Sequence, residues 1–547
     1  MNIAQLLSDQ ATARPDTPAL IDVRHGRCRT LSFADLEGAS ARAATLLRQA
    51  GLRQGDGVLV VHPMSAELYV ALTAIFRLGL TAMFLDPAAG RSHIERCCEI
   101  QRPVALIASP RAHLLRLVSP AMRRIPIKFV VGWPLPGAVP WGRADSLPPR
   151  AEITRCDPDT PALLTFTSGS TGEPKAAVRT HGFLLAQHGM LERSLALAPG
   201  RVDLATLPVV LLANLASGVT SVIPDADLRR PGNIEPAAVV AQIQRHQVRS
   251  TAASPALLER LARHCEERGL VLPTLERVAA GGAPVFPPLL DRLQQMAPNA
   301  EVLALYGSTE AEPIARITRE EMAPADVQAM FDGHGALAGS PVAGIQLRIL
   351  GDRWGNPIGP YTRAAFAAAC LAPGEAGEIV VSGEHVLAGY WRGHGDRETK
   401  FRVDSAVWHR TGDAGYLGAD GRLWLLGRCA ARVADGRGVL YPLAVECALS
   451  RFPEIRRAAV VGHQGRRTLL VEPWEGAGAL DLSDVADRLQ WAELDTLREC
   501  ARIPVDGRHN AKIDYPALHA LLDREPRLRA PRTSVRRDVP LAGMRGL

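Results

Sequence analysis

The chain has 547 residues and a mass of 58.8 kDa, which is too long for one ordinary core and predicts about three or four folding units of roughly 150 residues. Its 47% hydrophobic and 22% charged residues are typical of a globular protein and exclude bulk disorder, collagen and coiled coil. The net charge of +6, from 63 basic and 57 acidic residues, is small for this length and gives no reason to expect a nucleic-acid partner.

No secretory signal or integral membrane segment is expected. The first thirty residues lack a basic region followed by an apolar run, and the apolar stretch at 68–85 is interrupted by Arg77 and Gly79. The nine cysteines are scattered without a C-x-x-C pair, which favours a reduced, cytoplasmic protein. Only four basic residues are lysines, so each is a candidate for a position that requires a compact ammonium group; they are Lys128, Lys175, Lys400 and Lys512.

In chain order, the first half alternates short apolar runs with segments of helical spacing. The apolar runs of a first unit lie at 57–61, 81–85, 104–107 and 128–131, with a helix at 67–77. A second unit, from about residue 162, has helices at 239–246 and 255–267 and strands at 275–280 and 301–306. Strands separated by helices of this length predict two layered α/β units with largely parallel sheets.

The pattern changes after about residue 335, where the runs 344–349 and 377–381 alternate and predict antiparallel strands. A strand at 422–428 precedes a compact C-terminal segment. We therefore predict an α/β protein whose large domain, residues 1–428, has two layered α/β subdomains and a small β-subdomain. A small, mobile α+β domain follows at 429–547. From about residue 524 the chain holds seven arginines and three prolines, which favours a frayed basic tail over an arm for nucleic acid or membranes.

The segment 165–175 reads TFTSGSTGEPK and follows an apolar run, so it is expected to be a loop that leaves a strand. Glycines let backbone amides turn toward an anion, hydroxyls add donors, and the lysine supplies a movable charge. A flexible Ser/Gly linker is the alternative, which the terminal Pro–Lys disfavours. The segment does not fit G-x-x-x-x-G-K-[ST], and G-x-G-x-x-G, G-x-S-x-G and H-E-x-x-H are absent from the chain. The expected phosphate contacts are Thr167, Ser168, Gly169, Ser170, Thr171, Gly172 and Lys175.

This loop resembles the phosphate-binding signature of the AMP-forming adenylating enzymes, which include acyl-CoA synthetases, luciferases and peptide-synthetase adenylation domains. Further motifs follow in that family's order over nearly the whole chain: AGGAP at 280–284, YGSTE at 306–310, RTGD at 410–413 and GR at 427–428. The resemblance implies that an adenine ring lies against Gly282, Ala283 and Pro284 and stacks on Tyr306. It further implies that Ser308 and Thr309 lie near phosphate, that Glu310 holds magnesium and that Asp413 binds the ribose. Arg428 would end the large domain, and Lys512 would be the catalytic lysine of the small domain.

These residue types suit the implied reaction, in which a carboxylate is joined to the α-phosphorus of ATP and pyrophosphate leaves. Two anions meet, so positive charge is required, and Mg²⁺ on Glu310 together with Lys175 can supply it. Asp413 suits a ribose because a carboxylate accepts two hydrogen bonds at once. Lys512 could bridge the attacking carboxylate and the α-phosphate. Taken alone, Asp413 could be a turn residue and Lys512 part of a basic surface turn.

The substrate wall is expected at 209–218, an uncharged run that includes Val209, Asn214 and Gly218. It holds no Asp that could pair with an amino group, which favours a fatty acyl or similar apolar chain over an amino acid. Phrases such as 207–209, 220–225, 254–257 and 504–513 are most similar to the olefin-pathway β-lactone synthetases, which activate a β-hydroxy acid and let its own hydroxyl attack. A buried helix explains any single residue of 209–218 equally well.

Three departures from the family pattern concern the second step. Ala176 and Ala177 stand where Gly is usual, the hinge residues 429–431 read CAA, and the loop 433–439 lacks a Lys-x-x-Gly pattern. These changes put the domain rotation and the CoA tunnel in doubt and leave a role for CoA open. A ligase that transfers the acyl group to CoA or a carrier thiol therefore remains an alternative, as does a degenerate nucleotide-binding protein. Enzymes of the same pathway are expected as partners.

Overall fold

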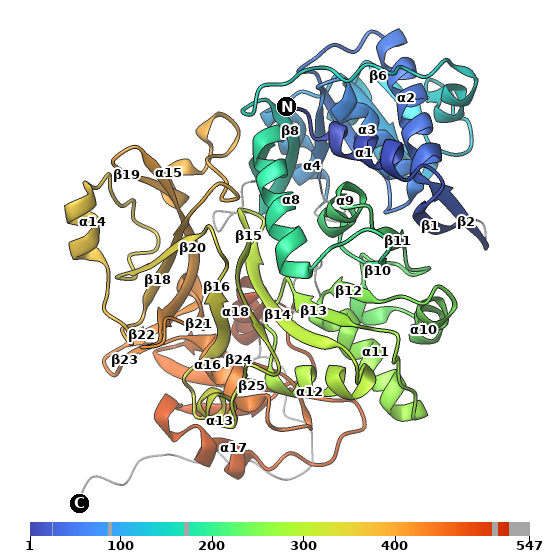
Figure 1. Cartoon of the computed structure of the whole chain (residues 1–547). Helices are drawn as coiled ribbons and strands as arrows, with labels where there is room; N and C mark the ends of the chain where they lie inside the picture. Colours follow the sequence, from blue (N-terminus) through green and yellow to red (C-terminus); the bar gives the residue numbers. More distant parts are fainter. Residues whose placement is uncertain (25, 86–89, 169–173, 506–511, 525–547) are drawn as a thin grey trace, which may run out of the picture.

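The protein is described by a computed structural model over residues 1–24, 26–85, 90–168, 174–505 and 512–524. Three parts follow one another along the chain: a blue N-terminal unit, a green and yellow central unit, and an orange to red part that ends in the small C-terminal unit (Figure 1). No helix within these ranges is both long and apolar enough to span a bilayer.

The N-terminal unit is built on a seven-stranded sheet in the order β7-β6-β5-β3-β4-β8-β9. All neighbours are parallel except β8 and β9, which form an antiparallel pair. Its strands are β3 (Gly57–Val61), β4 (Thr81–Phe84), β5 (Ala105–Ala108), β6 (Ile127–Val130), β7 (Val139–Pro140), β8 (Pro161–Ser168) and β9 (Pro174–Thr180). Its helices are α1 (Ala4–Ala13), α2 (Phe33–Gln49), α3 (Ala66–Arg77), α4 (Arg91–Ile100), α5 (Pro110–His113), α6 (Leu115–Val118) and α7 (Pro120–Arg124).

Local sequence signals explain where these helices begin. Ser32 and Asp35 form a capping box at the start of α2, since each side chain bonds the other residue's backbone amide. The Ser65 hydroxyl caps α3, and Glu67 places negative charge in its first turn, where the helix dipole favours it. The apolar stretch at 68–85 is thus a buried helix followed by a strand, as its interruption by Arg77 and Gly79 predicts.

A second, fourteen-stranded sheet runs through the rest of the large part of the chain. Its path is β17-β18-β20-β21-β16-β15-β14-β13-β12-β10-β11-β1-β2, with β19 paired to β20. The parallel portion contains β10 (Val202–Ala205), β11 (Thr220–Val222), β12 (Ser250–Ala253), β13 (Arg277–Gly281) and β14 (Glu301–Ser308), and at its edge β1 (Pro18–Arg24). The edge strand β2 (Arg27–Ser32) pairs antiparallel with β1. The antiparallel portion contains β15 (Ala311–Thr318), β16 (Ala336–Pro341), β17 (Gln346–Leu350), β18 (Gly377–Ser382), β19 (Lys400–Val403), β20 (Ala406–Leu417) and β21 (Leu423–Arg428).

This arrangement confirms the predicted change from parallel to antiparallel strands and adds two features to it. The β-subdomain is not a separate sheet, because β14 pairs with β15 and β16 pairs with β21 to continue the central sheet. The strands β1 and β2 come first in the chain yet belong to the central sheet, through the parallel pair β1–β11. The helices of this part are α8 (His181–Leu195), α9 (Pro208–Ala216), α10 (Pro236–Arg245), α11 (Pro255–Arg268), α12 (Pro287–Met296), α13 (Pro324–Phe331), α14 (Arg363–Ala369) and α15 (Asp396–Thr399).

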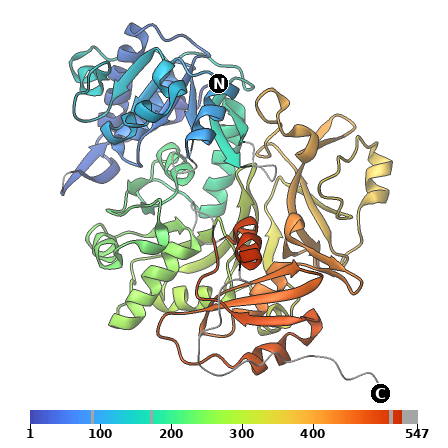
Figure 2. The ribbon, with the colours of Figure 1, turned by 180° about the vertical axis from the view of Figure 1, so that it is seen from behind.

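The chain after Arg428 forms two further sheets of its own, and the domain boundary expected near this residue stays a prediction. The small unit has a hairpin, β22 (Val433–Asp435) and β23 (Gly438–Leu440), and a three-stranded sheet of β24 (Ile455–His463), β25 (Arg466–Pro473) and β26 (Thr496–Glu499). Its helices are α16 (Pro442–Leu449), α17 (Leu482–Arg488) and α18 (Tyr515–Arg524). Figure 2 shows α18, in red, in front of the region where the green and orange parts meet.

Candidate active site

The first group of site residues lies where β14, β20 and β21 meet. Tyr306, near the end of β14, donates its hydroxyl to Asp413 Oδ2 at 2.8 Å. Arg428 pairs with Asp413 in the β20–β21 register, and its Nε lies 3.1 Å from Asp413 Oδ1. Burial, followed by the charge of Asp413, raises the pKa of Tyr306 well above its ordinary value, so the phenol keeps its proton. The two oxygens of Asp413 are therefore held in place by a hydroxyl and a guanidinium from neighbouring strands.

The turn after β13 lies beside this group, because β13 and β14 are adjacent parallel strands. A Cβ on Gly281 would come within 3.1 Å of the Leu305 carbonyl oxygen, so this position favours glycine. Gly282 has φ +85°, a left-handed backbone conformation that also favours glycine. The carboxyl ends of parallel strands are where α/β sheets bind ligands, so Ala283 and Pro284 begin at a position suited to one wall of a binding site.

Glu310 is the centre of a second group. Its Oε1 accepts a hydrogen bond from the Tyr390 hydroxyl at 2.6 Å, and its carbonyl oxygen accepts one from the Leu387 amide at 2.7 Å. Burial by itself raises the pKa of Glu310, but His409, the Tyr390 hydroxyl and the ammonium of Lys400 together bring it below its ordinary value. The carboxylate is therefore ionised at neutral pH, as a ligand of a hard cation must be.

Lys400 and His409 had no assigned role in the sequence motifs, and the structure places both beside Glu310. Lys400 Nζ donates to the Leu387 carbonyl oxygen and lies 5.7 Å from the centroid of the Tyr390 ring. Burial lowers the pKa of Lys400 to about 8 and that of His409 to about 3. The small number of lysines had singled Lys400 out, but only the fold could show that it approaches Glu310.

Lys175, at the start of β9, reaches the same region from the N-terminal unit. Its Nζ lies 3.0 Å from Glu398 Oε2 and 5.9 Å from the centroid of the Tyr390 ring. In the β8–β9 register, Thr167 pairs with Lys175. Of the other predicted phosphate contacts, Ser168 is described only through its backbone in β8, and Gly169, Ser170, Thr171 and Gly172 lie outside the described residues.

Lys512 belongs to the small unit, yet its charge reaches the large one. Burial raises the pKa of Glu312, while the charges of Arg179 and Lys512 oppose that rise. Arg179 in turn donates from Nη2 to the carbonyl oxygen of Thr309 at 3.0 Å. The structure thus brings Lys512 within electrostatic reach of Glu312 in β15, two residues after Glu310 in the turn between β14 and β15. In the same turn, the Ser308 hydroxyl accepts a hydrogen bond from the Glu310 amide at 3.2 Å.

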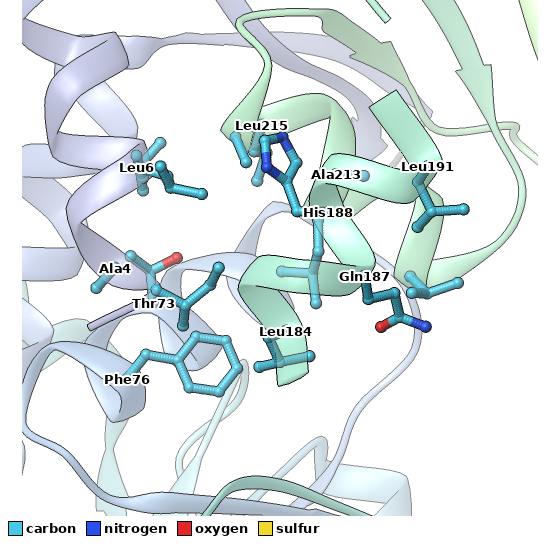
Figure 3. Close-up of a pocket in the computed structure, with 15 residues that line it drawn as sticks. Ala4, Leu6, Thr73, Phe76, Leu184, Gln187, His188, Leu191, Ala213 and Leu215 are labelled. Carbon is cyan, nitrogen blue, oxygen red and sulfur yellow. The ribbon is translucent and has the colours of Figure 1, made fainter. Parts of the chain in front are cut away.

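The predicted substrate wall is divided between a cavity and the interior of the fold. An apolar cavity of about 50 Å³ lies between α1, α3, α8 and α9 (Figure 3). Val209 lines it and packs against the same hydrophobic cluster as Leu305 of β14, the strand that carries Tyr306. The polar side chains in its lining are Thr73, Gln187 and His188.

Asn214 and Gly218 do not line this cavity. Asn214 Nδ2 donates to Asp203 Oδ2 at 2.8 Å and to Ser221 Oγ at 3.1 Å, so its amide supports a buried carboxylate. Gly218 has φ +72°, and a Cβ there would come within 2.5 Å of Arg14 Nη1. Both contacts serve the fold, and a role for either residue in binding substrate stays a prediction.

The donor set around Glu310 fits a magnesium ion that is bound together with phosphates. Within the described ranges no three His, Cys, Asp or Glu side chains are grouped as a metal site. Mg²⁺ is commonly held by one or two carboxylates while substrate phosphates and water complete its shell. Glu310 offers one ionised carboxylate. Lys175 Nζ lies 5.9 Å from the ring of Tyr390, whose hydroxyl contacts Glu310, so a second positive charge is available for phosphate oxygens near the ion.

Comparison with known proteins agrees with these features. A profile described as AMP-binding enzyme matches residues 7–391. The chain is similar to an olefin beta-lactone synthetase of Stenotrophomonas maltophilia, with 33% identity over 94% of this chain and 97% of that protein. It is 29% identical to a feruloyl-CoA synthase of Amycolatopsis over 82% and 83% of the two chains. Among solved structures, an o-succinylbenzoate coenzyme A synthetase of Bacillus subtilis in complex with ATP and magnesium superposes with a TM-score of 0.73, at 23% identity and over 92% and 98% of the chains.

Proposed function

Because the chain belongs to the AMP-binding enzyme family, we propose that it activates a long-chain β-hydroxy acid as acyl-AMP and then closes it to a β-lactone. The family makes it an acyl-adenylate-forming ligase that uses ATP. The finer assignment is supported above all by the 33% identity, along nearly the whole chain, to an olefin beta-lactone synthetase.

In the first step, an oxygen of the acid attacks the α-phosphorus of ATP, and the bond to the β-phosphate breaks to release pyrophosphate. Asp413, held by Tyr306 and Arg428, would accept the ribose hydroxyls and fix the nucleotide. Lys512 would place its ammonium between the two anions that meet, and Lys175 would face the leaving phosphates. Bound Mg²⁺, held by Glu310, would neutralise negative charge on the phosphate oxygens.

In the second step, the β-hydroxyl oxygen attacks the activated acyl carbon, the bond to AMP breaks, and the hydroxyl proton leaves. The nucleophile belongs to the same chain as the carbonyl, so no further substrate has to be ordered. The strain of the four-membered ring is offset by cleavage of the mixed anhydride.

The junction between the two parts of the chain favours this second step over transfer to CoA. Cys429 is fully buried in a cluster that contains Leu426 of the large part and Tyr441 and Ala444 of the small unit. The Tyr441 hydroxyl donates across the same junction to Asp352 at 3.0 Å. A large rotation about residues 429–431 would have to open this cluster, whereas lactone closure requires no such rotation.

The test is to incubate the protein with ATP, Mg²⁺ and a long-chain 2-alkyl-3-hydroxy acid, with and without CoA. We expect lactone and AMP in equal amounts without CoA, and no diversion of product when CoA is added. The matched acid without its 3-hydroxyl should support ATP–pyrophosphate exchange but give no lactone. A thioester formed only with CoA would identify an acyl-CoA ligase, and no exchange over a broad acid panel would favour a degenerate nucleotide-binding protein.

A further inference from the structure

Exposed apolar side chains gather on one end of the N-terminal unit. Of the nine large hydrophobic residues that are exposed in the described part of the chain, four fall between residues 114 and 133. Leu117 and Trp133 are 75% and 77% exposed, and Leu114 and Val118 are 61% and 52% exposed. Single exposed hydrophobic residues are ordinary on a protein surface, but a group of four within so short a segment indicates a binding surface.

The same segment carries positive charge only. No Asp or Glu occurs from residue 100 to residue 144, whereas the basic residues in this interval are Arg102, Arg111, Arg116, Arg123, Arg124, Lys128 and Arg143. Within the described ranges none of these seven forms an ion pair, and Lys128 instead donates to the carbonyl oxygen of Ile125. Acidic residues flank this interval on both sides. Before it, Glu95 of α4 accepts a hydrogen bond from the Ser119 hydroxyl at 2.5 Å and Glu99 is exposed; after it, Asp145 is exposed two residues beyond Arg143.

Contacts within the unit hold the loop after β6 against α5 and α6, and α7, which carries Arg123 and Arg124, also contacts α6. The loop after β6 lies along α5 and α6, since Gly132 is next to Pro110 and Gly137 is next to the guanidinium of Arg116. Trp133 sits between these two contact points in the chain. Leu115 of α6 packs on the core, and its neighbours Leu114 and Leu117 turn outward. We call Leu114, Leu117, Val118, Trp133 and the seven basic residues of this segment the outer face, a name for the segment 102–143. Its strand β6 lies at the end of the molecule opposite the C-terminal unit (Figure 1).

Charge argues against two possible occupants of the outer face, namely the C-terminal segment of this chain and a second copy of the chain. The terminal segment 525–547 is rich in arginine and would be repelled by the outer face. A second copy that docked by the same face would bring two sets of basic residues together, which is unfavourable for a symmetric dimer. The occupant must therefore be anionic and must also accept leucine and tryptophan side chains.

We propose that the outer face docks the protein on an anionic phospholipid bilayer. Arginine and lysine are attracted to acidic headgroups, tryptophan prefers the interface, and leucine side chains enter the acyl boundary. This inference goes beyond the proposed function and does not depend on it, although a long-chain acid is itself a molecule that partitions into bilayers.

The test uses the full chain and two kinds of vesicle, phosphatidylcholine alone and phosphatidylcholine with phosphatidylglycerol. We expect sedimentation with the anionic vesicles only, and a loss of binding as salt is raised. Leu117→Asp combined with Trp133→Ala, and separately Arg123→Gln with Arg124→Gln, should each weaken binding at least tenfold. Val439→Asp is the matched control, since Val439 is 55% exposed on the hairpin of the small unit and should bind as the parent does.

Retained ATP–pyrophosphate exchange with a soluble short-chain acid shows that each variant is folded, and separates failure of this inference from failure of the proposed function. Absence of vesicle binding by the parent protein at low salt would overturn the proposal. Binding of the parent protein to neutral vesicles as strong as its binding to anionic vesicles would also overturn it. So would a loss of binding in Val439→Asp as large as the loss in the outer-face variants. A dimer in light scattering that Leu117→Asp dissociates, without vesicle binding, would show that the face joins protein to protein instead.

Discussion

Replacing Lys400 with methionine should make the protein more stable and less active. The fold lowers the pKa of this side chain from 10.5 to about 8, chiefly by burial. A shift of about 2.5 units corresponds to roughly 3 kcal/mol that the folded state loses by keeping the ammonium charged at pH 7. Methionine fills a similar volume without charge, so Lys400→Met should raise the melting temperature by several degrees, less the small loss of the bond to the Leu387 carbonyl oxygen.

The pH dependence of this gain has a defined sign. Below pH 8 the lysine is protonated in both states and the folded state bears the full cost. Between pH 8 and 10.5 the folded lysine loses its proton before the unfolded one, so the cost falls and is roughly halved or more by pH 9.5. The difference in melting temperature between Lys400→Met and the parent should therefore shrink from pH 7 to pH 9.5.

Activity should change in the opposite direction. Lys400 is one of the charges that hold Glu310 ionised, so its loss should lower magnesium-dependent ATP–pyrophosphate exchange. Differential scanning fluorimetry and the exchange assay measure the two effects on the same samples. A variant that is less stable than its parent at pH 7, or whose difference in melting temperature grows with pH, would refute the reasoning.

Three further predictions follow from the site and its surroundings. Lys512→Ala should slow adenylation by several orders of magnitude with little change in ATP affinity. Lys512→Arg should not restore the rate, because the planar guanidinium group cannot take the position of the compact ammonium group, and near-normal turnover by the Arg variant would contradict this. Asp413→Asn should weaken ATP binding about tenfold or more in calorimetry yet leave tripolyphosphate binding unchanged, since only the ribose contact is altered; equal losses for both ligands would argue against a ribose contact. Asn214→Ala should destabilise the fold by about 1–3 kcal/mol, because it removes a donor from buried Asp203, whose pKa burial raises to about 6. That loss should be larger at pH 8 than at pH 5, where Asp203 is protonated, and a loss independent of pH would show that the bond to Asp203 is not its cause.

The fold could be predicted from the sequence where a periodic run of apolar residues is bounded by helix caps or glycines. Helix α3 and strands β13 and β18 lie close to the predicted positions. Each is a run of apolar residues with a helix cap or a glycine at one end. The continuity of the central sheet could not be predicted, because pairing between β16 and β21 depends on residues far apart in the chain. Tyr306, Asp413 and Arg428 belong to three motifs that are far apart in the sequence. The structure brings their side chains into contact.

Other parts of the site had no signal in the sequence. No role is predicted for Tyr390 from the sequence, yet its hydroxyl contacts Glu310 and its ring lies within 6 Å of both Lys175 and Lys400. His409 precedes the RTGD motif by a single position and is fully enclosed by neighbouring strands. The substrate role predicted for Asn214 stays a prediction. An isolated amide in an apolar run suits either a polar substrate group or a buried carboxylate, and only the fold reveals Asp203 as its partner.

The pairing of β1 with β11 has a consequence for how this protein is made. Residues 18–32 leave the ribosome well before their partner, because Thr220–Val222 emerges only after the whole segment from Phe33 to Val219 has been synthesised. At roughly 5–20 residues per second, the early hairpin waits about 10–40 s with one edge open. During that time an unpaired edge strand can associate with other chains. Expression at low temperature with an N-terminal solubility partner therefore risks burying the edge that the central sheet requires, whereas a C-terminal partner leaves it accessible until β11 arrives.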